Sequence, residues 1–142
     1  MDDPRVARIV ALYESLSPAA LPQLAGIYTA DARFKDPFND VQGIAAIRGI
    51  FEHMYRTLDG PRFVVHERVL QGEQCFLTWD FIFRLRQGDK REIVVRGASH
   101  LRLAADGRIE GHRDYWDVAE ELYEKLPLLG ALMRWLKRRV NA

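Results

Sequence analysis

The chain has 142 residues, of which 48% are hydrophobic and 29% are charged, and its formal net charge is +1. This composition suits one globular domain with a proper core, and it excludes a disordered chain. Because there is no basic excess, the charge gives no support to a nucleic-acid partner.

The cysteine content and the first residues indicate the cellular compartment. Cys75 is the single cysteine, so an internal disulfide is excluded. The acidic start, Met1 to Pro4, lacks the basic and apolar regions of a signal peptide. No apolar run reaches the roughly 20 residues of a membrane span. We therefore expect a cytoplasmic protein.

The first quarter of the chain predicts two helices. Asp3-Pro4 is typical of a helix start, with aspartate as the N-cap and proline at the first helical position. Apolar residues then recur at helical spacing: Val6, Ile9, Val10, Tyr13 and Leu16. Ser17-Pro18 ends this helix, and a shorter one is predicted over residues 22–28.

The next segment predicts little regular structure before a third helix. Residues 31–40 are expected to be irregular, with one short strand. Gly43 opens the third helix, and residues 59–61, Asp-Gly-Pro, end it. One face of this helix is apolar: Ile44, Ile47, Phe51, Met54 and Leu58.

The middle of the chain changes to a period of two, which is typical of strands with one buried face. We predict strands over residues 63–72, 75–85, 93–103 and 109–116. Gln87-Gly88-Asp89 is the expected hairpin turn between the second and third of these.

The C-terminal segment predicts one more helix. Residues 117–120 have the pattern of a capping box, Pro127 interrupts the helix, and residues 128–140 resume it with an apolar side and a basic end. Two uses of this segment stay open: its apolar side closes a cavity or packs on a partner subunit, or the helix lies on an anionic membrane surface. The favourable position of cations at a helix C-terminus favours the first use.

The order of these elements predicts an α+β fold, because helices and strands do not alternate. We expect a cone in which a strongly curved antiparallel sheet wraps around the N-terminal helices. The whole chain, 1–142, is predicted to be a single domain, with residues 118–140 as a helical extension.

Several segments resemble the NTF2-like superfamily, in particular its ketosteroid isomerase-like and SnoaL-like branches. The matching residues are 28–38, Gly43, 106–109 and 114–116. The resemblance runs from about Val6 to Asp117 and implies a cone-shaped fold around an apolar pocket. It leaves the activity open, since this fold serves isomerases, cyclases, other enzymes and plain binding.

The resemblance to ketosteroid isomerase also assigns residues. Asp36 matches the general base, and Tyr13 matches the oxyanion-hole tyrosine. Ser99 stands where that enzyme has a protonated aspartate, which argues against steroid isomerisation. His112, Asp114 and Trp116 fall on the strand that faces the pocket in this superfamily.

The residues themselves support two interpretations of each candidate. Asp36 lies between Phe34 and Phe38, and an apolar setting makes a carboxylate a stronger proton acceptor. An aspartate before proline also commonly caps a turn. His112 and Asp114 share one strand face, so they form either an acid–base unit or a structural network.

Other candidates are expected to have structural roles. The Tyr13 ring belongs in the core, and its hydroxyl needs a partner there. Ser99 is most simply explained by a bond to the backbone, and Cys75 by an inert buried thiol. The predicted pocket lining is aromatic and apolar: Phe34, Phe51, Met54, Tyr55, Trp79 and Trp116.

Together these features predict a protein with a pocket for a small apolar ligand. The favoured activity is proton transfer, as isomerisation or cyclisation, on an apolar carbonyl compound without metal or cofactor. The alternatives are non-catalytic binding of a lipid-like ligand, and a homodimeric module formed through the outer sheet face with Arg84, Arg96 and Arg102.

Overall fold

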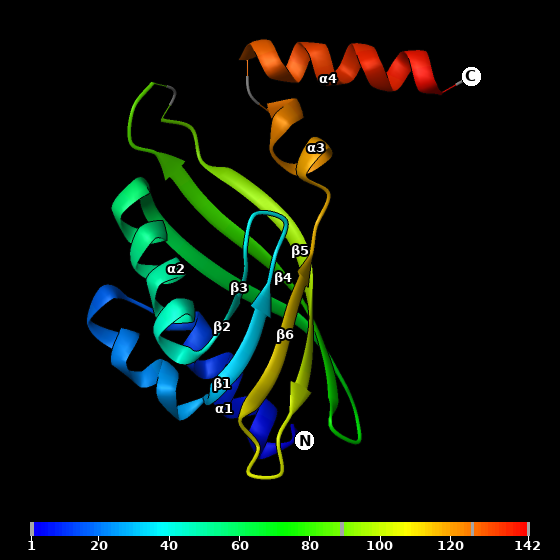
Figure 1. Cartoon of the computed structure of the whole chain (residues 1–142). Coiled ribbons are helices and arrows are strands. Elements are labelled where there is room, and N and C mark those ends of the chain that lie inside the picture. Colours follow the sequence, from blue (N-terminus) through cyan, green and yellow to red (C-terminus); the bar gives the residue numbers. More distant parts are fainter. Residues whose placement is uncertain (1, 89, 126, 142) are drawn as a thin grey trace.

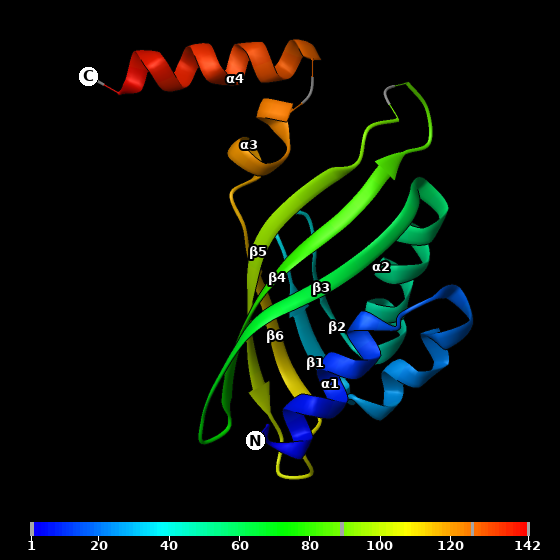
Figure 2. The ribbon, with the colours of Figure 1, turned by 180° about the vertical axis from the view of Figure 1, so that it is seen from behind.

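The computed structural model describes residues 2–88, 90–125 and 127–141. Helices α1 and α2 lie on one side of a curved sheet (Figure 1), and the view from behind shows α4 standing beyond the end of that sheet (Figure 2). The elements in chain order are α1 (Pro4–Glu14), the 3-10 helix η1 (Pro18–Gly26), β1 (Tyr28–Lys35), β2 (Asp40–Gln42), α2 (Ile44–Thr57), β3 (Leu58–Gln71), β4 (Gln74–Leu85), β5 (Ile93–Leu103), β6 (Ile109–Tyr115), α3 (Val118–Glu121), the 3-10 helix η2 (Tyr123–Lys125) and α4 (Pro127–Val140).

The strands form one six-stranded sheet in the order β2-β1-β6-β5-β4-β3. Neighbouring strands are antiparallel except β1 and β6, which run parallel. Strands far apart in the sequence therefore lie side by side at the centre of the sheet. The predicted α+β class and the curved sheet are confirmed.

The core lies between α1, α2 and the inner face of the sheet. The predicted cap of α1 is confirmed: Asp3 accepts a hydrogen bond from the Arg5 backbone N–H at 2.9 Å, and Pro4 is the first helical residue. The buried side of α1 meets the alternate buried residues of β4 and β5. Each apolar side chain fully buried there contributes about 1.5–3 kcal/mol.

Two predictions for the N-terminal third differ from the structure. Residues 18–26 form a 3-10 helix, because Pro18 and Pro22 each lack an N–H donor, and Tyr28 begins a strand. Within residues 31–40, only 36–39 lie outside strands, so the expected irregular segment is confined to this turn. The other residues carry most of β1, which pairs with β2 in a hairpin whose register joins Arg33 to Gln42.

The end of α2 also differs from the expected position. The helix ends at Thr57, and Leu58 already belongs to β3. The segment Asp59-Gly60-Pro61 lies within that strand, where the pairing with β4 shifts register. An edge strand can accommodate Pro61, since its missing N–H need not join the ladder.

The C-terminal helix begins as predicted but is broken earlier. Asp117 caps α3 by accepting a hydrogen bond from the Glu120 N–H at 3.1 Å, yet α3 has only four residues. Pro127 does not interrupt a helix but opens α4. Of the predicted hairpin turn, Gly88 has a positive φ of 80°, and Asp89 lies outside the described residues.

Within the part of the chain that the structure describes, no helix has the length and apolar character to cross a membrane.

The three arginines of the predicted dimer surface have different surroundings. Arg96 is bonded to Glu121 and Glu120 of α3 and remains exposed. Arg84 pairs with Glu92 at 3.3 Å. Arg102 is exposed. Dimerisation through this face stays a prediction.

Candidate functional site

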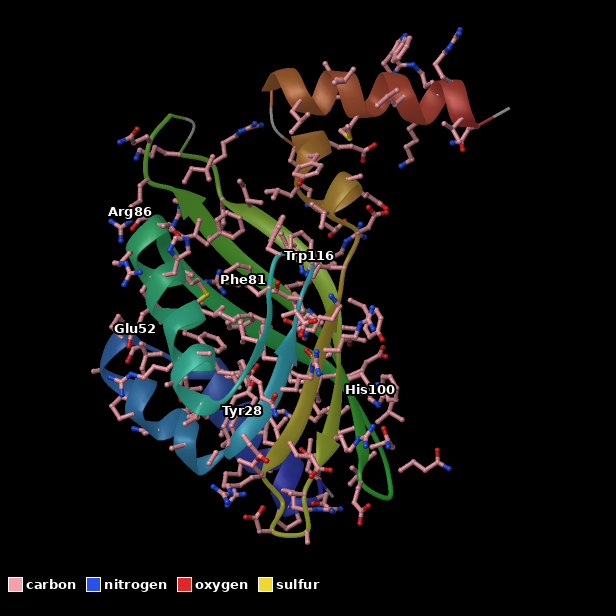
Figure 3. The ribbon with its side chains drawn as sticks, viewed as in Figure 1. Tyr28, Glu52, Phe81, Arg86, His100 and Trp116 are labelled. Carbon is pink, nitrogen blue, oxygen red and sulfur yellow. The ribbon has the colours of Figure 1, made fainter. Side chains whose placement is uncertain are left out.

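A cavity of about 350 Å³ lies between the helices and the concave face of the sheet. Figure 3 shows Phe81 and Trp116 on the inner side of the sheet and His100 on its outer side. Most lining side chains are apolar, and the polar ones come from β5 and β6, from the turn after β1 and from α1 and α2. The apolar lining includes Phe34, Phe51, Met54, Leu77, Trp79, Phe83, Val95, Leu101 and Trp116.

Polar side chains of this cavity are joined in one hydrogen-bonded chain. Trp79 Nε1 donates to Ser99 Oγ at 2.8 Å, and Ser99 Oγ donates to Asp114 Oδ1 at 2.6 Å. The same carboxylate oxygen is 2.6 Å from His112 Nε2. We call the chain formed by Trp79, Ser99, Asp114, His112, Tyr28 and Tyr13 the polar relay.

The far side of the polar relay consists of two tyrosines. The Tyr28 hydroxyl lies 2.7 Å from His112 Nδ1 and is also bonded to the Tyr13 hydroxyl. Tyr28 is fully buried, whereas Tyr13 reaches the cavity wall. The relay therefore ends at Trp79 and Tyr13, and all of its members except Tyr28 line the cavity.

Strand register places these side chains together. Ser99 on β5 is opposite Asp114 on β6, and residues two apart on β6 share a face, which brings His112 beside Asp114. The parallel pairing of β1 with β6 sets Phe34 opposite His112, and their ring centroids are 4.5 Å apart. Packing thus holds the imidazole on the inner face.

Two arrangements of the protons along the polar relay fit its geometry. Burial raises the pKa of the Tyr13 and Tyr28 hydroxyls far above the usual range, so both stay protonated. With a neutral His112, Nδ1 accepts from Tyr28, and Tyr28 accepts from Tyr13. With an imidazolium, Nδ1 donates to Tyr28 and Tyr28 to Tyr13, which frees the Tyr13 proton for the cavity.

Asp114 has one carboxylate oxygen free. Both of its hydrogen bonds go to Oδ1. Among the described residues, no buried side-chain nitrogen or oxygen lacks a partner, so Oδ2 is not buried. Since Asp114 lines the cavity, Oδ2 is a proton acceptor within reach of a ligand.

Asp36 also lines the cavity, but its carboxylate is used by its own turn. Oδ1 accepts from the backbone N–H groups of Phe38 at 2.8 Å and Asn39 at 2.7 Å. The Asn39 side-chain amide lies 3.1 Å from both oxygens. The turn-capping interpretation of this residue is therefore present in the structure, and its role as the base stays a prediction.

The structure joins four of the five predicted catalytic residues, Tyr13, Ser99, His112 and Asp114, in one hydrogen-bonded chain. Asp36 lines the same cavity, just after Phe34 and Lys35, which pair with His112 and Arg113 of β6, but its hydrogen bonds go to its own turn. Ser99 differs from expectation, because its hydroxyl bonds to side chains and not to the backbone. Of the predicted lining residues, only Tyr55 is not in the wall, and it packs against the core.

Sequence reasoning missed Tyr28, the link between Tyr13 and His112. The segment before residue 29 was expected to be helical, so no strand face was assigned to it. The alternate burial of Tyr28, Ala32 and Phe34 in β1 is the signal that could have placed its side chain in the core.

Among the described residues, His, Cys, Asp and Glu side chains that could bind a metal ion do not gather in groups of three or more. Cys75 is buried, and burial raises the pKa of its thiol, as expected for an inert cysteine.

A curved sheet closed over helices around an apolar cavity defines the NTF2-like class of α+β cones. A model of the SnoaL-like domain matches residues 9–112, and the chain belongs to the SnoaL-like family. Among curated proteins, none matches this chain in sequence.

Solved structures share the fold at low sequence identity. A protein from Catenulispora acidiphila with a ketosteroid isomerase-like fold, in complex with trimethylamine, has a TM-score of 0.72 at 17% identity, with 86% of this chain and 92% of that one covered. An NTF2-like protein from Burkholderia pseudomallei has a TM-score of 0.73 at 16% identity, with 84% and 95% covered. A candidate SnoaL-like polyketide cyclase from Jannaschia has a TM-score of 0.72 at 15% identity, with 84% and 92% covered.

Proposed function

We propose that the protein catalyses cofactor-independent proton transfer at a carbon next to a carbonyl group in a largely apolar compound. The observation that supports this is the free Oδ2 of Asp114 in an apolar cavity that Tyr13, at one end of the polar relay, also lines. A base and a hydrogen-bond donor at one polar end of a cavity are the two groups that enolisation requires.

In the proposed reaction, Asp114 Oδ2 takes the proton and the C–H electron pair moves to the carbonyl oxygen. The resulting enolate accepts a hydrogen bond from Tyr13, whose proton is free when His112 is an imidazolium. Return of the proton to another carbon completes an isomerisation. Attack of the enolate carbon on a second carbonyl group gives a cyclisation, in line with the name of the Jannaschia neighbour.

The competing base is Asp36. Its carboxylate already accepts four hydrogen bonds from its own turn. Protonation would weaken the turn that these bonds hold. We therefore favour Asp114, and the two assignments lead to opposite results in the same experiment.

The test follows exchange of α-hydrogens for deuterium in D₂O, by NMR, across a panel of apolar ketones and β-diketones. Asp114→Asn is expected to lower the exchange rate by about 10²- to 10⁴-fold. Asp36→Asn, the matched control, should leave the rate nearly unchanged. If Asp36→Asn abolishes exchange while Asp114→Asn retains it, our assignment of the base is wrong.

Tyr13→Phe tests the donor in the same assay. Loss of one oxyanion donor is expected to cost about 10²- to 10³-fold in rate. An exchange rate for Tyr13→Phe equal to that of the unchanged chain would contradict the role of Tyr13 as the donor.

A second candidate is non-catalytic binding of an apolar, lipid-like ligand. The apolar wall of the cavity favours this candidate. The polar relay favours it too, because its buried polar atoms already have hydrogen-bond partners. Native mass spectrometry of the purified protein would detect a bound ligand. A bound apolar compound together with no deuterium exchange on any ketone of the panel would favour this candidate over the enzyme.

A further inference from the structure

Helix α4 attaches to the rest of the protein through its polar side. Arg134 donates from Nη1 to the Glu124 carbonyl, and Lys137 Nζ lies 3.6 Å from Glu124 Oε1. Gly130 is buried against the same Glu124 carbonyl, so closely that a Cβ at this position would overlap it. Residues 130, 134 and 137 share one side of a helix.

The apolar side of α4 is exposed. An amphipathic helix ordinarily turns its apolar side towards the core, and α4 does the opposite. Figures 1 and 2 both show α4 beyond the end of the sheet, away from α1 and α2. The exposed apolar residues are Leu129, Leu132, Trp135, Leu136 and Val140. We call these five residues the α4 apolar face.

The α4 apolar face does not close the cavity, contrary to one use expected from the sequence. The described lining reaches Trp116 and Leu122 and includes no residue of α4. A different surface must therefore cover these side chains if they are covered at all.

The charge of α4 indicates what kind of surface fits. The helix contains Arg134, Lys137, Arg138 and Arg139 and no acidic residue. A second copy of α4 laid against the first would bring cations near cations, which is unfavourable. An anionic surface complements them.

Trp135 adds a second indication. The Arg139 guanidinium lies over its ring, 5.7 Å from the centroid, so a cation and an aromatic ring occur together on the exposed side of α4. Such residues are typical of the boundary between lipid chains and headgroups.

We propose that α4 binds the surface of an anionic lipid bilayer, lying in the interface with the α4 apolar face among the acyl chains. This interaction is independent of the chemistry proposed for the cavity. It also explains why the exposed apolar side chains of α4 and its cations occur on one helix, since a bilayer surface takes up both.

Co-sedimentation with vesicles tests the proposal. The full chain is mixed with vesicles of equal parts phosphatidylglycerol and phosphatidylcholine, and separately with phosphatidylcholine alone. We expect binding to the anionic vesicles and much weaker binding to the neutral ones. Arg138→Gln combined with Arg139→Gln should lower the partition coefficient about thirtyfold, at about 1 kcal/mol per cation.

Leu132→Ser combined with Leu136→Ser should lower the partition coefficient for the anionic vesicles by about a hundredfold or more. The matched controls change the same residue types elsewhere. Phe76→Ser and Arg102→Gln alter an exposed apolar residue and an exposed arginine on the outer sheet face, and both should bind as the unchanged chain does.

Two results would overturn the proposal. The first is equal sedimentation of the unchanged chain with anionic and neutral vesicles, or none with either. The second comes from light scattering without lipid: a dimer that Leu132→Ser/Leu136→Ser converts to a monomer would show that a second copy covers the α4 apolar face. Circular dichroism of each variant verifies that the helix content is unchanged.

Discussion

At the residue scale, one glycine shapes the cavity. Gly97 on β5 is opposite Trp79 on β4, and the indole ring lies over the glycine backbone. A Cβ at this position would overlap the ring. Trp79 could then not keep both its place in the cavity wall and its hydrogen bond to Ser99. The small residue therefore fixes one end of the polar relay.

Gly97→Ala is expected to lower the free energy of unfolding by about 1–3 kcal/mol, because overpacking displaces the indole. Chemical denaturation measures this change, and tryptophan fluorescence reports the new environment. Gly111→Ala on β6 is the control, since its Cβ would be at an ordinary 3.6 Å from Arg102 Cβ. A cost for Gly111→Ala as large as for Gly97→Ala would contradict the argument.

Part of the polar relay was predictable from spacing. The pairing of His112 with Asp114 follows from two positions on one strand, and the burial of Ser99 follows from the period of β5. The contact between Ser99 and Asp114 depends on the register of β5 against β6, which no local pattern specifies. The position of Asp36 was predictable, but the bonds that occupy its carboxylate depend on how the turn closes.

At the scale of the elements, α3 is held to the sheet by an ion pair. Arg96 Nε and Nη2 each donate to the Glu121 carboxylate at 2.9 Å, and the Arg96 backbone N–H donates at 2.7 Å. The Glu121 side chain is buried, and these hydrogen bonds lower its pKa to about 2 despite the opposing effect of burial. A four-residue helix has little stability of its own, so this contact positions it.

The contact gives a pH-dependent contribution to stability. Because the pKa of Glu121 is lower in the folded protein than its usual 4.5, the contribution is complete above about pH 4.5 and is lost as the pH falls towards 2. Glu121→Gln should cost about 2 kcal/mol at neutral pH. The difference from the unchanged chain should vanish near pH 2, as measured by denaturant unfolding across pH.

Glu120→Gln serves as the matched control. Glu120 pairs with Arg96 at 3.3 Å in an exposed position, so its loss should cost less than about 0.5 kcal/mol at any pH. Equal costs for the two variants would indicate that burial of Glu121 does not matter.

The long strands were the most predictable elements, because their period of two extends over many residues. The helix predicted over residues 22–28 is wrong, since the proline and apolar side chains there fit a helix start as well as a 3-10 helix. The break after Glu121 was missed because the capping pattern indicates where a helix starts and not how far it runs.

At the scale of the whole molecule, the cavity wall draws on both helices and most strands. Its lining comes from α1, α2, β1, β3, β4, β5 and β6. A ligand that fills it must therefore stabilise the body of the protein as a unit. Helix α4 contributes no described lining residue and lies outside that unit.

A saturating apolar ketone such as 2-acetylnaphthalene is expected to raise the free energy of unfolding, by about 2.7 kcal/mol at a hundred times its Kd. Hydrogen exchange should slow in α1, α2 and the inner strands together, while α4 exchanges as before. Protection confined to α4 or to the outer sheet face would show that the compound binds elsewhere.

The parallel pair of β1 and β6 has a consequence for folding. β6 lies between β1 and β5, so Tyr28 finds its neighbour Ile109 only after most of the chain has been made. On the ribosome, β1 can pair with β2 but must wait for β6, its second neighbour, and closing this long loop costs chain entropy before their contacts form. Insertion of β6 is therefore expected to be the late step of folding. The chain in which β6 has not yet paired with β1 is the species most exposed to aggregation.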